Sequence, residues 1–81
     1  MRSGVAFATA LELWAASRER AITDVSARAR ALAEQGCHED AAFFNFVGRL
    51  LTVRAVHERA QAAAVRDTSS ETLVAEPQPA V

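Results

Sequence analysis

The side chains best suited to chemistry lie together in the run Cys37-His38-Glu39-Asp40. Thiolates, imidazoles and carboxylates are the common protein ligands of zinc and other transition metals. Their spacing is not that of a metal site, because the chain has no Cys-x-x-Cys, His-x-x-x-His or Glu-x-x-His pattern. The other histidine, His57, is expected about five helical turns away, opposite Arg18. The sequence therefore predicts no metal site and no cofactor.

Cys37 could act as a nucleophile only with a base within hydrogen-bond reach and a third group that orients this base. Its neighbour His38 would point elsewhere on a helix, and we interpret His57 as a structural residue at the edge of the core. The chain has no glycine-rich phosphate loop and no Gly-x-Ser-x-Gly elbow. A unit of two helices also offers no concave pocket of its own. We therefore expect that the chain is not an enzyme.

Two helices joined by a short turn must position these residues. Hydrophobic residues make up 51% of the chain, which has three glycines and two prolines, and this composition favours helices. In 81 residues there is room for one domain with a marginal core. The sequence predicts an all-α fold, an antiparallel two-helix hairpin that is coiled-coil-like. Its expected parts are an N-terminal extension (1–8), the hairpin (9–67) with helices at 9–35 and 38–66 and a turn at 36–38, and a flexible tail (68–81).

Local signals mark the expected ends of these helices. Thr9 and Glu12 fit a capping box, in which each side chain satisfies a free backbone amide of the first turn. An earlier, frayed start near Ser3 is the alternative. Gly36 is expected to end the first helix, because glycine adopts the positive φ of a helix C-terminus at the least steric cost. Two prolines near the C-terminus favour a flexible tail there.

The charge pattern argues against several classes of partner. The net charge is −1, and the nine basic residues, all arginines, alternate with carboxylates, so no nucleic-acid partner is expected.

A single cysteine is typical of a reducing, cytoplasmic environment. Glu12 interrupts the first apolar run before it reaches the length of a signal peptide, and no stretch is long enough to span a membrane. An arginine-only basic set favours a high-GC bacterial source.

The second helix has two apolar stripes at helical spacing, and the first helix can cover only one of them. A tight hairpin centred near Cys37 pairs residues at equal distances from the turn. We expect the hairpin core to consist of Leu11, Trp14, Ile22, Val25, Leu32, Phe43, Leu50 and Val53, with Trp14 packed against small alanines. The second stripe would then face water. We predict that it binds a partner through Phe44, Val47, Leu51 and Ala55, with Arg49 and Arg54 as rim charges that tune partner choice.

The segment from Arg28 to Phe44 resembles the turn region of the small needle co-chaperones of type III secretion, the YscE/PscE-like helical hairpins. The likeness lies in an Arg- and Ala-rich first helix, a short turn at Gly36-Cys37, and a second helix that carries Phe43; it covers roughly 25–61. The resemblance implies a cytoplasmic protein that joins a helical-repeat chaperone and keeps the needle subunit soluble and monomeric. The tail from Thr68 to Val81 departs from this pattern.

Two other readings of the sequence compete with a co-chaperone. In the first, two copies of the hairpin form a four-helix bundle through the same Phe44/Leu51 stripe and act as a docking or scaffold module. In the second, the chain is a small all-α enzyme of the chorismate mutase type that uses Arg18, Arg28 and Arg49. That enzyme needs a third helix, which residues 68–81 can hardly supply.

Overall fold

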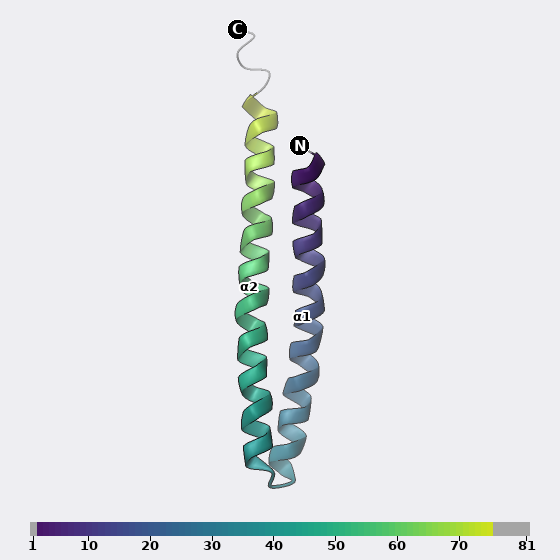
Figure 1. Cartoon of the computed structure of the whole chain (residues 1–81), viewed down its shortest axis with the longest axis vertical. Helices are drawn as coiled ribbons and strands as arrows, with labels where there is room; N and C mark the ends of the chain where they lie inside the picture. Colours follow the sequence, from purple (N-terminus) through teal and green to yellow (C-terminus); the bar gives the residue numbers. More distant parts are fainter. Residues whose placement is uncertain (1, 76–81) are drawn as a thin grey trace.

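The computed structural model describes the backbone of residues 2–75 and the side chains of residues 4–68. The chain forms two long helices, α1 (Arg2–Glu34) and α2 (His38–Ala75). They lie side by side and antiparallel, so that both described ends of the chain lie at the end of the hairpin opposite the turn, where α2 projects beyond the start of α1 (Figure 1). The predicted all-α hairpin is therefore confirmed.

The turn at Gly36 is formed as the sequence predicts. Gly36 has a φ of 83°, in the region that glycine adopts without strain. The Cys37 amide donates to the Leu32 carbonyl at 2.8 Å and the Gly36 amide donates to the Ala33 carbonyl at 3.0 Å, which is the pairing of a Schellman motif. The Cys37 carbonyl then accepts the first bond of α2, from Ala41 at 3.0 Å. The chain thus reverses direction within three residues.

Both helices are longer than the sequence predicts at the open end of the hairpin. α1 begins at Arg2, so the predicted extension is wrong for 2–8 and the capping box at Thr9 is wrong, while residue 1 lies outside the described residues. Thr9 and Glu12 lie inside α1, and both accept hydrogen bonds from Arg66. α2 runs to Ala75, so the predicted tail is wrong for 68–75, while 76–81 lies outside the described residues. Threonine and serine cost a helix only a fraction of a kcal/mol each, too little to end it without glycine or proline.

The helices meet along a strict heptad pattern. On α2 alanine or glycine recurs at every seventh position, and on α1 alanine does so except at Ile22, with larger side chains at the positions between them, as in antiparallel coiled coils. We call this set the inner seam, and all its members are buried or half-buried. It comprises Ala8, Leu11, Ala15, Arg18, Ile22, Val25, Ala29 and Leu32 on α1, and Ala41, Phe44, Gly48, Leu51, Ala55, Glu58, Ala62 and Val65 on α2.

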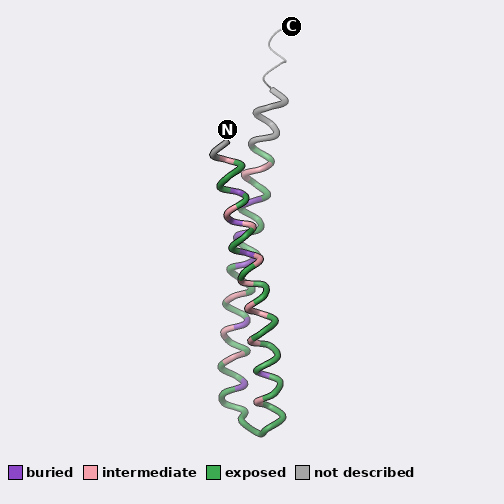
Figure 2. Tube along the Cα trace, turned by 90° about the vertical axis from the view of Figure 1, so that its right-hand side faces the viewer, coloured by how far each residue is buried: buried purple, intermediate pink, exposed green. Residues whose placement is uncertain are grey.

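Larger side chains of α1 pack against small residues of α2 in this seam. Leu11 lies with Ala8 and Ala62 in one buried cluster, against which Val65 packs. In the half of the hairpin next to the turn, the Val25 side chain lies 3.5 Å from the position that a Cβ would occupy on Gly48. Most of the buried positions lie in the half of the hairpin away from the turn (Figure 2). The half next to the turn has fewer buried positions, Ala29, Ala41 and Gly48.

The predicted division of the α2 stripes is reversed in the structure. Phe44, Val47, Leu51 and Ala55, predicted to bind a partner, lie on the side of α2 that faces α1, with Ala55 only 3% exposed. Four predicted core residues instead point outward. Their exposed fractions are Trp14 54%, Phe43 61%, Leu50 54% and Val53 67%. The other predicted core residues, Leu11, Ile22, Val25 and Leu32, do lie in the inner seam.

The size of the contacting side chains explains this rotation. Ala41, Gly48, Ala55 and Ala62 fall on the same face of α2 as Phe44 and Leu51, and such small residues let two helix backbones approach closely. Turning α2 to bury Phe43, Leu50 and Val53 instead would hold the helices apart. Close packing of the backbones therefore outweighs burial of the largest side chains against α1.

Alanine in place of Gly48 should stabilise the hairpin by about 0.5–1 kcal/mol, because glycine lowers helix stability by that amount relative to alanine. The added Cβ would lie 3.5 Å from Val25, an ordinary van der Waals contact. Thermal unfolding followed by circular dichroism would show a higher midpoint. A midpoint at or below that of the original chain would show that α1 and α2 lie too close together at this position to accept the Cβ, contrary to the 3.5 Å spacing.

Candidate interaction surface

One ion pair lies inside the inner seam, near the middle of the hairpin. Arg18 Nε donates to both carboxylate oxygens of Glu58, at 2.8 and 3.0 Å. Glu58 is only 5% exposed, so its charge depends on this partner. The bond from Arg18 lowers the pKa of the Glu58 carboxyl, against an opposing effect of desolvation. The pair therefore fixes how the two helices face each other at this level.

Two further ion pairs run along one edge of the seam. Arg59 donates to Glu19 through Nε and Nη2, each at 2.7 Å. Arg66 donates to Glu12 in the same two-pronged way, at 2.8 and 2.7 Å. Hydrogen bonds from the arginines lower the pKa of both carboxyls. On this edge α1 is acidic and α2 is basic.

The stability of the hairpin should fall as the pH drops below about 4.5, the ordinary pKa of a glutamate. Glu12, Glu19 and Glu58 all have a lowered pKa in the folded chain. Their contribution is therefore complete above the unfolded pKa and is lost as the pH falls through the folded values. Glu12 and Glu19 are partly exposed, so salt weakens their share.

Unfolding by urea between pH 3 and pH 7 would measure this dependence. The variant Glu12→Gln/Glu19→Gln/Glu58→Gln should be less stable than the original chain at pH 7 and should lose less stability on acidification. Parallel profiles for the two proteins would show that these carboxylates do not carry the acid sensitivity.

A second heptad stripe lies on the outside of α2. Phe43, Phe46, Leu50 and Val53 follow the same three- and four-residue steps as the inner seam, displaced by two positions. We call these four residues the outer seam. Each is at least half exposed, between 50% and 67%. They lie in the half of α2 next to the turn.

Two arginines flank the outer seam. Arg49 lies beside it on one edge and Arg54 on the other, and both are exposed. No ion pair joins either guanidinium to a carboxylate among residues 4–68. The sequence predicts Arg49 and Arg54 as rim charges of the stripe that contains Phe44. In the structure they flank the outer seam instead.

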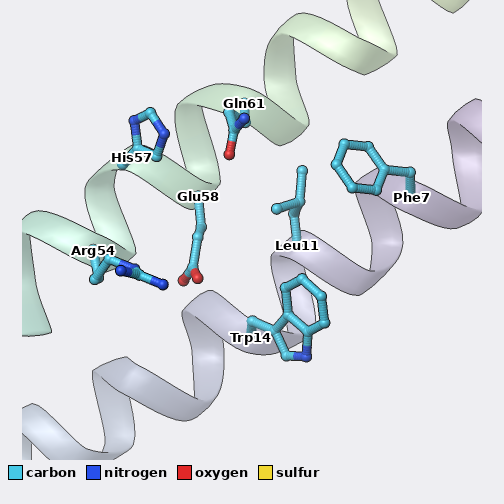
Figure 3. A pocket seen from close by; sticks show the side chains of 7 residues that line it. All are labelled: Phe7, Leu11, Trp14, Arg54, His57, Glu58 and Gln61. Atoms are coloured by element: carbon cyan, nitrogen blue, oxygen red, sulfur yellow. The ribbon is translucent and has the colours of Figure 1, made fainter.

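A shallow groove of about 400 Å³ lies at the other half of the hairpin. Figure 3 shows apolar side chains of α1 opposite polar side chains of α2 around it. The lining residues are Phe7, Leu11, Trp14, Arg54, His57, Glu58 and Gln61. The carboxylate of Glu58 is already bonded to Arg18, so the groove does not offer it as a free acid or base.

The residues first considered for chemistry are not brought together. Cys37 and His38 are exposed at the turn, and the described part of the chain contains no group of three metal-ligating side chains. Glu58, not His57, lies opposite Arg18, which makes the predicted place of His57 wrong.

The arginines considered for a mutase also point to separate partners. Arg18 bonds Glu58, and Arg28 bonds Asp24 one turn away on α1 at 3.2 Å. Ten residues separate the two arginines, which places them about 15 Å apart along the helix. They do not form one anion-binding cluster.

Sequence reasoning found both α2 stripes but exchanged their roles. A signal that distinguishes them is present in the sequence: alanine or glycine at every seventh position from Ala41 to Ala62. On α1 alanine follows the same seven-residue spacing at Ala8, Ala15 and Ala29, with Ile22 in the remaining position. Only the stripe with small residues on both helices allows close contact.

No protein-family model, curated protein or solved structure matches this chain. Over the described residues, neither helix has an apolar stretch with the length and hydropathy needed to cross a bilayer.

Proposed function

We propose that this chain is a protein-binding helical hairpin whose outer seam receives a helix of another protein. The observation that carries this proposal is the row of four large apolar side chains at heptad spacing, all at least half exposed. A helix partner fits such a row because it can place its own apolar side chains between them.

The hairpin leaves the four apolar side chains of the outer seam without a covering partner. Burying a side chain such as Phe or Leu completely is worth about 1.5–3 kcal/mol relative to leaving it exposed. The hairpin leaves Phe43, Phe46, Leu50 and Val53 largely in water, while its own core is built mainly from alanine. A contiguous apolar surface of this kind is typical of an interaction site.

The resemblance of 28–44 to type III secretion needle co-chaperones supports a more specific form of this function. In that form the hairpin binds a helical-repeat chaperone, and together they keep the needle subunit soluble and monomeric. Such a role requires no catalytic group, only a stable hairpin with an apolar helix face. The alternative is a four-helix bundle of two copies that meet through the outer seam.

Site-specific photo-cross-linking in the native host cells tests this proposal. A benzophenone amino acid at position 50, inside the outer seam, should give a discrete adduct with another protein. The matched control is position 27, because Ala27 is exposed on α1 at about the same height above the turn. An adduct between two copies of the chain would favour the four-helix bundle. Equal labelling at both positions, or none at position 50, would contradict the proposal.

A further inference from the structure

We infer that the outer seam binds a helix whose own apolar seam is edged by carboxylates, an inference that rests on the proposed function. Arg49 and Arg54 lie on opposite edges of the outer seam, Arg49 near its middle and Arg54 at its Val53 end. A docked helix would bring its edge positions close to both guanidinium groups. Opposite charges at those positions make the two surfaces complementary.

The hairpin itself contains an example of this arrangement. Along the inner seam, Glu12 and Glu19 of α1 reach Arg66 and Arg59 of α2, with oxygen–nitrogen distances of 2.7 to 2.8 Å. α1 is thus a helix with a heptad seam and an acidic edge, bound to the basic edge of α2. The outer seam also combines apolar side chains at heptad spacing with basic edges, since Arg49 and Arg54 flank it on both sides.

The same arginines argue against a second copy as the occupant. If two outer seams packed in parallel, Arg49 would face Arg54 of the second copy, because edge positions five residues apart meet in parallel coiled coils. If they packed antiparallel with Phe46 against Leu50 of the second copy, the two copies of Arg49 would lie near each other at the centre. Both arrangements place like charges together. Glu58, four residues from Arg54, is bonded to Arg18 within the inner seam, and Glu39 and Asp40 lie at the turn end of α2, beyond the outer seam.

Two synthetic helices of about four heptads, with identical alanine–leucine seams, test the inference. One carries glutamate at its edge positions and the other lysine, and binding to the full chain is measured by isothermal titration calorimetry. Two exposed ion pairs predict that the glutamate peptide binds up to about tenfold more tightly at low salt. The difference should shrink in about 1 M NaCl, where the Debye length falls to roughly 3 Å.

A charge-reversed pair of variants locates the effect. Arg49→Glu/Arg54→Glu should reverse the order of the two peptides. The control Arg20→Glu/Arg30→Glu makes the same change in net charge at exposed positions of α1 and should leave the order unchanged. Circular dichroism establishes that each variant keeps its helix content.

Equal affinities for the two peptides, no binding of either peptide, or an order that Arg49→Glu/Arg54→Glu does not reverse would overturn the inference. Its failure is distinct from failure of the proposed function. If an adduct with another protein still forms at position 50, the seam binds a partner without an acidic edge. If that adduct is also missing, the proposed function fails with it.

Discussion

Leucine in place of Ala55 should push the two helices apart and lower the free energy of unfolding by about 1–3 kcal/mol, the usual cost of overpacking a tight core. Ala55 is 3% exposed and lies in the inner seam one heptad from Gly48, where the backbones approach closely. A larger side chain there has no room without a shift of α1. Thermal unfolding by circular dichroism should show a midpoint lower by about 4–8 °C for each kcal/mol.

Ala60→Leu is the matched control for this prediction. Ala60 is exposed on the outside of α2, so the same substitution there should change stability by no more than about 0.5 kcal/mol. The pair of variants also distinguishes the two possible rotations of α2. If Ala60→Leu were the more damaging change, the stripe with Leu50 and Val53 would face α1 and the inner seam would be assigned wrongly.

Aspartate at both Phe46 and Leu50 should abolish partner binding while the hairpin stays folded. Both side chains are about half exposed, so the change removes little of the core. Central apolar anchors of an interface cost at least about 2 kcal/mol each when removed, roughly a 30-fold loss of affinity per residue. Loss of the cross-link from a neighbouring outer-seam position, Val53, would measure this in cells.

Leu13→Asp is the control for the paired substitution. Leu13 is 65% exposed on α1, outside both seams, and its replacement should leave the cross-link intact. Helix content measured for all variants separates loss of binding from loss of folding. A Phe46→Asp/Leu50→Asp protein that still cross-links as well as the Leu13→Asp protein would show that the outer seam does not bind the partner.

The hairpin and its turn could be predicted from the sequence because they depend on local chemistry. Gly36 identifies the only position at the turn where a positive φ is cheap, and steps of three and four residues identify the helices. The pairing register was also predictable, since a tight turn forces residues at equal distances from it to meet. Arg18 and Glu58 lie within one helical turn of that register.

The rotation of α2 was harder to predict because two apolar stripes compete for one neighbour. Counting large side chains favours Phe43, Leu50 and Val53 for the core, whereas the observed contact depends on small residues such as Ala55 and Gly48. The helix ends were misjudged for a different reason. Thr9 and Glu12 match a capping box, but their side chains serve Arg66 across the hairpin instead. Such a long-range partner leaves no local trace.

The tightest contacts of the hairpin join residues that are far apart in the chain. Arg18 and Glu58 are separated by 40 residues, and Glu12 and Arg66 by 54. Closing such long loops costs more conformational entropy than closing the short loop at Gly36. We therefore expect the contacts next to the turn to form first during folding and the contacts at the opposite end to form last. A helix that arrives at the outer seam meets the part of the hairpin that forms first.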